Sequence, residues 1–206
     1  VAKVDSSGGL VANTFVGSVA GYDTAHGIAV DSSGDSYVSG ASSVTWGSPL
    51  TPFTADAVFA AKVDVQRPTV SSISFLDSNP TNDASVEYQV TFSEPVTGVA
   101  TSDFGLSTSG VTFTSIASVV GSGSTYTVTV NTGSGDGTIH LRVMGWADIF
   151  DLAGNSITGL PYLSGPTYTV DKTAPSVVSI TRADPNPTTA DSVNFTVTFS
   201  ESIPWA

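Results

Sequence analysis

Five side chains that carry oxygen ligands could meet around one metal ion. Asp64 lies in a polar joint, Glu94 ends a run of alternating apolar residues, and Asp148, Asp151 and Asn155 share one later stretch. Carboxylate and amide oxygens are the ligands that a hard cation such as Ca²⁺ binds in proteins. We therefore predict a Ca²⁺ site at a joint between domains, formed by these five residues.

The same residue types also form turns that bind no metal. Asp and Asn favour turns because their side chains hydrogen-bond to nearby backbone groups. In that alternative, Asp151 and Asn155 close a turn and Glu94 ends a strand in solvent. Asp31 and Asp35 flank another turn but lack the Asp series and the distal glutamate of a calcium loop, so we interpret them as turn residues.

The sequence contains few groups that could catalyse a reaction. It has no cysteine, only two histidines, and no serine in a Gly-x-Ser-x-Gly motif. Asp148 and Asp151 could act as acid and base, but nothing in the surrounding sequence supplies an apolar pocket to separate their pKa values. We predict that the chain is not an enzyme, with no catalytic or cofactor-binding residues and, apart from Ca²⁺, no cofactor.

Composition narrows the classes of partner. Eighteen acidic residues against six basic ones give a net charge of −12, which disfavours nucleic acid and anionic membrane surfaces. Hydrophobic residues make up 40% of the chain, enough for a core, but no apolar run has the ~18–20 residues of a membrane span. We expect no membrane insertion, and as partners the neighbouring repeats of the same chain and a protein or glycan ligand.

A long internal repeat divides the chain. The stretch from Asn79 to Glu94 recurs from Asn186 to Glu201, and the same offset maps Asp64 onto Asp171. A period of this length indicates tandem domains, because each unit is long enough to close its own core. We predict three parts, namely 1–64, a complete domain at 65–174, and the first two strands of a second copy at 175–206.

The complete domain shows the period-two alternation of half-buried strands. About seven short strands in ~100 residues, separated by glycine-rich turns, indicate an all-β fold of the immunoglobulin-like sandwich type. The apolar positions expected to face its core are Ile73, Phe75, Val86, Tyr88, Val90, Phe92, Val111, Phe113, Ile116, Tyr126, Val128, Val130, Ile139, Leu141, Val143, Tyr168 and Val170.

This topology is what would bring the five ligands together. In such a sandwich the second strand runs back to the pole where the chain enters, and the loop between the last two strands lies at that same pole. Glu94 would then meet the loop of Asp148, Asp151 and Asn155, next to Asp64 in the entering joint.

Two stretches resemble known families. The segments Thr91–Val96, Gly135–Ile139, Asp151–Asn155 and Tyr168–Pro175 are similar to bacterial Ig-like domains, which occur in tandem in large surface and secreted proteins. That resemblance implies an extracellular or cell-surface spacer or adhesion module without catalysis. Residues 25–40, followed by 57–64, resemble bacterial β-propeller repeats of the SBBP type, which implies that 1–64 is the last blade of an incomplete propeller.

Two further expectations concern the C-terminal segment and the alternative functions. In 175–206, Val193, Phe195, Val197 and Phe199 form an apolar stripe with no opposing sheet, so we expect disorder or pairing with a sheet edge elsewhere. The alternative functions are an accessory module of a secreted hydrolase, or carbohydrate binding through the exposed aromatic residues Trp46, Trp146 or Tyr162.

Overall fold

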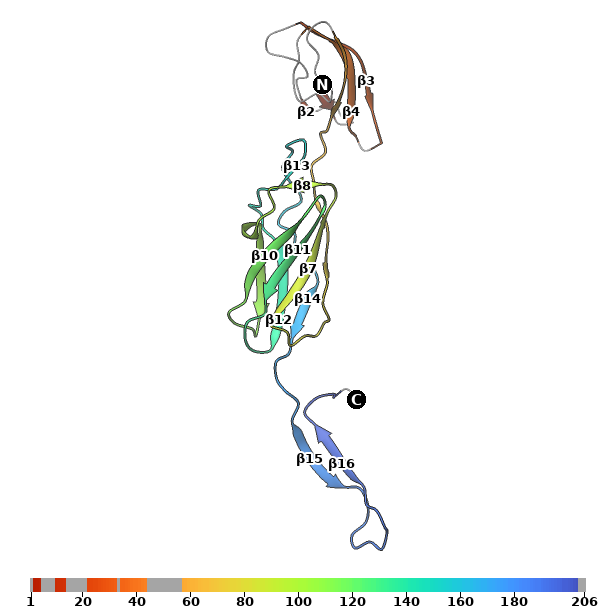
Figure 1. Cartoon of the computed structure of the whole chain (residues 1–206), viewed down its shortest axis with the longest axis vertical. Coiled ribbons are helices and arrows are strands. Elements are labelled where there is room, and N and C mark those ends of the chain that lie inside the picture. Colours follow the sequence, from red (N-terminus) through yellow and green to blue (C-terminus); the bar gives the residue numbers. More distant parts are fainter. Residues whose placement is uncertain (1, 5–9, 14–21, 33, 44–56, 204–206) are drawn as a thin grey trace.

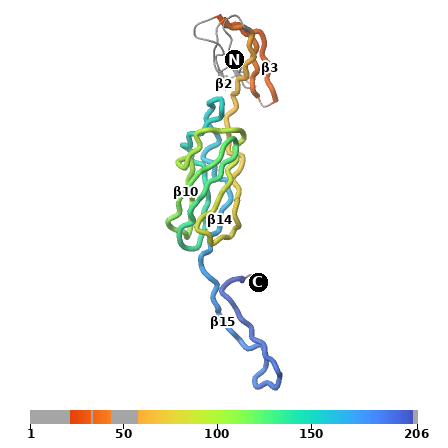
Figure 2. The backbone as a smooth tube through the Cα atoms, viewed as in Figure 1, coloured from red at the N-terminus to blue at the C-terminus, as the bar shows by residue number. Residues whose placement is uncertain are grey.

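The computed structural model describes residues 2–4, 10–13, 22–32, 34–43 and 57–203, and these form three bodies that follow one another along one axis (Figure 1). The backbone tube shows the same order, with the sandwich between the N-terminal strands and a C-terminal hairpin (Figure 2). Within the described ranges, the one helical element is the 3₁₀ turn η1 (Thr101–Asp103), and no helix is long and apolar enough to cross a membrane.

The N-terminal body contains a three-stranded antiparallel sheet of β3 (Asp23–Val30), β4 (Ser36–Ser42) and β5 (Ala57–Val63), in the order β3-β4-β5. A separate pair, β1 (Ala2–Val4) with β2 (Leu10–Asn13), precedes it. The predicted hairpin across residues 27–40 is confirmed by the pairing of β3 with β4. A propeller blade has four strands, so the propeller interpretation of this part stays a prediction.

The central body is a sandwich of two antiparallel sheets. One has the order β10-β11-β7-β6, and the other has the order β14-β12-β9. This is the strand order of a constant-type immunoglobulin domain. The strands are β6 (Val70–Phe75), β7 (Ser85–Phe92), β9 (Phe104–Ser109), β10 (Ser115–Ser122), β11 (Thr125–Asn131), β12 (Gly137–Val143) and β14 (Thr167–Val170).

A short pair of strands closes one pole of the sandwich. β8 (Val96–Thr97) pairs with β13 (Phe150–Asp151), and both lie at the end of the sandwich that faces the N-terminal body (Figure 1). β8 follows β7, and β13 belongs to the long connection from β12 to β14. The pole therefore gathers the two parts of the chain that carry Glu94 and Asp151.

The core lies between the two sheets and follows the predicted alternation. On β7, Val86, Tyr88, Val90 and Phe92 are at most 2% exposed, whereas the residues between them are half-buried. The Tyr88 hydroxyl donates to the backbone carbonyl oxygen of Ile139 in the opposite sheet at 2.7 Å. Alternation alone thus identified the buried face of this strand.

The prediction was wrong between Val111 and Ile116. Val111 is buried, but Phe113 is 88% exposed and has a φ of 60°, and β10 begins only at Ser115. The chain turns here because Thr112 forms an isolated bridge with Ser134, with backbone hydrogen bonds of 2.9 Å in both directions. The strand that enters the opposite sheet is β9, which the alternation did not reveal.

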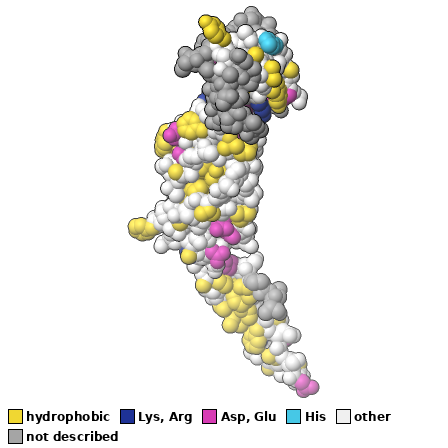
Figure 3. All heavy atoms as spheres, turned by 45° about the horizontal axis from the view of Figure 1, so that its top comes forward, with side chains coloured by type: hydrophobic (Ala, Val, Ile, Leu, Met, Phe, Trp, Pro, Cys, Tyr) yellow, Lys and Arg dark blue, Asp and Glu magenta, His cyan; other side chains and the backbone are white. Residues whose placement is uncertain are grey.

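The C-terminal body is a two-stranded hairpin of β15 (Val177–Arg182) and β16 (Phe195–Phe199). The expectation of disorder, or of pairing with a sheet edge elsewhere, was therefore wrong, because these strands pair with each other. Hydrophobic side chains gather on the surface of this hairpin (Figure 3). Val177, Ile180 and Phe195 are 53%, 63% and 58% exposed.

Candidate metal centre at the first joint

Three of the five predicted ligands converge at the joint between the N-terminal sheet and the sandwich. Asp64 follows β5 directly, Glu94 lies two residues beyond β7, and Asp151 ends β13. One carboxylate oxygen of each lies within 4.8 Å of the others. Asp151 is buried, and Asp64 and Glu94 are half-buried. The geometry can therefore present three carboxylates to a single cation.

A tight turn fixes the orientation of Asp151. Its Oδ1 accepts hydrogen bonds from the backbone N–H groups of Ala153, at 2.9 Å, and Asn155, at 2.7 Å. Gly154 has a φ of 89°, a conformation in which a side chain would be strained. The turn chemistry considered as the alternative to metal binding is therefore present, and it also holds the carboxylate in place.

Asn155 ties the loop to the entering joint. Its Nδ2 donates to Oδ2 of Asp151 at 2.8 Å and to the backbone carbonyl oxygen of Asp64 at 3.2 Å. Because both partners are acceptors only, the amide nitrogen must face them. Asn155 thus holds Asp151 and Asp64 through its amide nitrogen. The two hydrogen bonds do not direct its amide oxygen toward the three carboxylates.

Asp148 lies apart from the other acidic residues. Its side chain is exposed, and its backbone N–H donates to Oδ1 of Asp103 at 3.2 Å. It is not among the residues whose carboxylates meet within 4.8 Å. The structure thus brings together Asp64, Glu94 and Asp151, supports them with Asn155, and leaves out Asp148.

Hydrogen bonds hold the joint against the sandwich. The guanidinium of Arg67 donates from Nε to the carbonyl oxygen of Ser156 at 2.8 Å and from Nη2 to the hydroxyl oxygen of Ser156 at 2.5 Å. The backbone N–H of Gln66 donates to Oδ1 of Asp64 at 2.9 Å. Nε and Nη2 of Arg67 are therefore engaged with the Ser156 segment of the sandwich.

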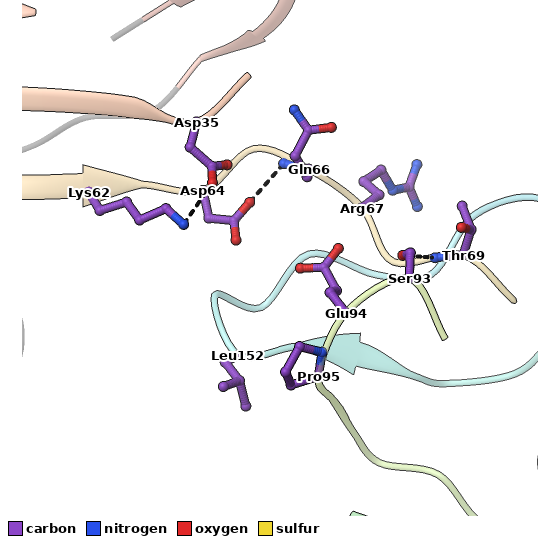
Figure 4. Close-up of a pocket in the computed structure, with 10 residues that line it drawn as sticks. All are labelled: Asp35, Lys62, Asp64, Gln66, Arg67, Thr69, Ser93, Glu94, Pro95 and Leu152. Atoms are coloured by element: carbon purple, nitrogen blue, oxygen red, sulfur yellow. Dashed lines mark hydrogen bonds and ion pairs between the residues drawn. The ribbon is translucent and has the colours of Figure 1, made fainter. Parts of the chain in front are cut away.

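The electrostatics of the cluster are those of crowded negative charge. A pocket of ≈ 660 Å³ opens between the two bodies, and Asp64 and Glu94 line it (Figure 4). Burial, and then the charge of Asp64, raises the pKa of Glu94. Burial also raises the pKa of Asp64, with the neighbouring carboxylates of Asp35 and Asp151 acting in the same direction. A cation bound here would relieve this repulsion.

Asp35 is a residue of this pocket that the sequence interpretation assigned only to a turn. Oδ1 of Asp31 does accept from the Asp35 backbone N–H at 3.1 Å, as turn chemistry predicts. The Asp35 side chain, however, lines the same pocket as Asp64 and Glu94. The signal that could have revealed it is strand register, because Ser36 pairs with Val63 and places Asp35 opposite Asp64.

The aromatic candidates for carbohydrate binding have different surroundings. Trp146 is 70% exposed, and its Nε1 donates to the carbonyl oxygen of Ser102 at 3.3 Å. Tyr162 is half-buried against the core, and its backbone bridges to Val143. Trp46 lies outside the described residues.

Comparison with known proteins supports the central part of the sequence interpretation. The model of a family described as a bacterial Ig-like domain matches residues 64–164, a range that holds Asp64, Glu94 and Asp151. No match was found among curated proteins or among solved structures. Nothing in these comparisons supports the propeller repeat expected at 1–64. The described residues form an all-β structure, and residues 64–164 of the chain are similar to bacterial Ig-like domains.

Proposed function

We propose that this chain is a non-catalytic spacer of an extracellular or cell-surface protein, which holds other parts of that protein apart. The observation that carries the proposal is the path of the chain. It enters the sandwich at one pole and leaves at the opposite pole, so the three bodies follow one another along the long axis (Figure 1). A module that adds length in this way suits a structural or adhesion-type role.

The contacts at the second joint support this role. Nζ of Lys172 donates to the carbonyl oxygens of Asn82, at 3.0 Å, and Asp83, at 2.9 Å. Its backbone N–H donates to Oδ1 of Asp136 at 2.6 Å, and the Thr173 hydroxyl donates to Oδ2 of the same carboxylate. The chain is therefore tied to the sandwich where it leaves, as it is where it enters.

The two joints also share one local device. The backbone N–H of Gln66 donates to Oδ1 of Asp64 at 2.9 Å, and one repeat later that of Thr173 donates to Oδ1 of Asp171 at 3.2 Å. A repeated turn at repeated joints is what a tandem array requires. The surface location rests on the acidic composition and on the kind of protein in which bacterial Ig-like domains occur.

Small-angle X-ray scattering of the whole chain tests the spacer. A compact protein of this length has a radius of gyration of about 17 Å, and an unfolded chain of about 49 Å. We expect a value clearly between these limits, with a distance distribution skewed to long distances. A radius at the compact limit would mean that the bodies fold back on one another and would contradict the proposal.

A second candidate function is adhesion through Trp146. This side chain is 70% exposed at the pole of the sandwich, and its hydrogen bond to Ser102 fixes the ring. Fixed aromatic rings provide platforms for sugars and for protein surfaces. We expect Trp146→Ala to abolish binding on a glycan array while Leu152→Ala, at another exposed apolar residue, does not. The absence of any glycan signal with the unaltered chain would remove this candidate.

A further inference from the structure

One buried carboxylate oxygen in the first joint has no hydrogen-bond partner. Asp35 is only 5% exposed, and its Oδ2 forms an ion pair with Nζ of Lys62 at 2.7 Å. Its Oδ1 is buried and accepts no hydrogen bond from any described residue. A buried polar atom without a partner destabilises the fold unless something else satisfies it. A cation bound beside this oxygen would satisfy it.

The unpaired oxygen belongs to the same pocket as the carboxylate cluster. Asp35, Asp64 and Glu94 line the pocket, and the Asp35 side chain points toward Asp64 (Figure 4). Asp151 adds the fourth carboxylate, since its oxygen lies within 4.8 Å of those of Asp64 and Glu94. Three carboxylates therefore meet within 4.8 Å, and the carboxylate of Asp35 lines the same pocket together with the cationic side chains of Lys62 and Arg67.

We infer that the first joint is a Ca²⁺ site shared by two bodies, in which Asp35 of the N-terminal sheet completes the set formed by Asp64, Glu94 and Asp151. The ligands are all oxygens, which suit Ca²⁺ rather than Zn²⁺, because no histidine or cysteine is among them. Ca²⁺ takes six to eight oxygens in flexible geometry, and the pocket of ≈ 660 Å³ has room for water to supply the rest.

The four ligands come from both bodies and from the joint between them, so a bound cation would link the two bodies. Asp35 precedes β4, Asp64 lies in the joint, and Glu94 and Asp151 belong to the sandwich. A cation that contacts all four fixes the N-terminal sheet against the sandwich. The joint is therefore stiff in Ca²⁺ and looser in a chelator. This inference goes beyond the spacer role, because a spacer could equally have a joint that binds nothing.

Isothermal titration calorimetry of the whole chain with CaCl₂, after treatment with a chelator, tests the site directly. We expect binding with a Kd of about 0.1–1 mM, the range of extracellular Ca²⁺ modules. Thermal melts should show a higher Tm in excess Ca²⁺ than in chelator, since a ligand of the native state raises stability by mass action. No heat of binding and identical melts at ~5 mM CaCl₂ would overturn the site.

Two variants test whether Asp35 is a ligand or only a structural residue. Asp35→Asn should weaken Ca²⁺ binding at least about tenfold, the loss typical of disturbing a metal site. Lys62→Met removes the ammonium that competes for Asp35, so it should tighten Ca²⁺ binding. If Asp35 had only a structural role through its ion pair with Lys62, both variants would lose Ca²⁺ affinity. Unchanged Ca²⁺ affinity in Asp35→Asn would overturn the shared site and would mean that Ca²⁺ binds without any ligand from the N-terminal sheet.

Matched controls come from the same chain. Asp148→Asn changes an exposed carboxylate of the same loop, and Asp171→Asn changes the position that repeats Asp64 at the next joint. Neither variant should alter Ca²⁺ affinity. A tenfold loss in Asp148→Asn would mean that the net negative charge of the region attracts Ca²⁺ without a defined set of ligands. Failure of Ca²⁺ binding would leave the spacer proposal standing, because the scattering test measures the dimensions of the chain and does not require bound Ca²⁺.

Discussion

The hairpin β15–β16 and the strands β6–β7 are two similar copies of one repeat in two different surroundings. Their registers are identical once the repeat offset is applied, with Val70 opposite Phe92 in one and Val177 opposite Phe199 in the other, and with the same register shift directly after that pair. In both copies an aspartate accepts a hydrogen bond from the backbone N–H ten residues later, Asp77 from Glu87 and Asp184 from Asn194. Local sequence alone therefore determines pairing, register and the turn.

Burial is where the copies differ. Val90 and Tyr88 of β7 are fully buried, whereas their counterparts Val197 and Phe195 in β16 are 43% and 58% exposed. In the sandwich, the sheet β14-β12-β9 covers this face and β11 pairs with the edge of β7. Two strands alone are marginally stable in water. The geometry of the repeat is thus local, and its stability comes from the opposing sheet.

The largest expected contrast is in backbone hydrogen exchange. Amides of β7 should exchange only through global unfolding, which for a domain requires about 5–15 kcal/mol, whereas those of β16 should open with little free energy. We expect protection factors at least about a thousandfold higher in β7 by native-state exchange measured with NMR or mass spectrometry. Equal protection of the two strands would show that something covers the hairpin in solution.

A matched pair of core substitutions should separate the copies next. Phe92→Ala removes a side chain that is 2% exposed, so the free energy of unfolding of the sandwich should fall by about 3–5 kcal/mol. The counterpart Phe199→Ala should change it by less than about 0.5 kcal/mol. Urea denaturation monitored by circular dichroism measures both. A comparable loss in Phe199→Ala would mean that the hairpin packs on the sandwich.

A smaller contrast is expected for the repeated aspartates. Oδ2 of Asp77 accepts the Glu87 backbone N–H at 2.6 Å, and its loss in Asp77→Ala should destabilise the sandwich by about 1–2 kcal/mol. Asp184→Ala should leave the main thermal transition where it is and only increase exchange within the hairpin. If both variants melt at the wild-type temperature, this hydrogen bond contributes nothing to stability.

The smallest expected effect is the pH dependence of stability at the first joint. The pKa of Glu94 is raised from 4.5 and that of Asp64 from 3.8, in both cases first by burial. For a carboxyl group with a raised pKa in the folded state, stability is present below the unfolded pKa and is lost as pH rises through the folded pKa. In chelator, the sandwich should therefore lose a little stability as pH rises above 4.5.

The control for this pH effect compares Glu94 with Glu201, the residue at the matching position of the repeat. Glu94→Gln should weaken this pH dependence, measured as the change in Tm across the range, whereas Glu201→Gln at the matching position should not. With saturating Ca²⁺ the sign should reverse, because carboxylate ligands bind metal only when deprotonated. A pH dependence left unchanged by Glu94→Gln would contradict the raised pKa of Glu94.

Much of the sandwich follows from local sequence. Alternation identified the buried faces of β7, β11 and β12 because one side of each strand packs on the opposite sheet. It failed at Phe113, where the apolar residue lies in a turn fixed by the bridge between Thr112 and Ser134. That bridge joins residues distant in sequence, and no local pattern reports it.

In the candidate site, too, some residues could be predicted from the sequence and others could not. Asp64, Glu94 and Asp151 could be brought together from topology, because strand order alone places their segments at one pole. Asp35 could not, since its position depends on the register of β4 against β5 across a long connection. Asp148 has the right residue type and the right loop, but the pairing of β13 with β8 leaves it on the surface.

The points where the chain enters and leaves the sandwich also determine how it responds to tension. A pull on the two joints drags β6 and β14 in opposite directions along their own lengths, so their hydrogen bonds to β7 and β12 are sheared together. In the hairpin, Val177 and Phe199 are partners at one end, and a pull between them unzips the pairs one at a time. One repeated strand pair is therefore mechanically resistant inside the sandwich and yielding outside it.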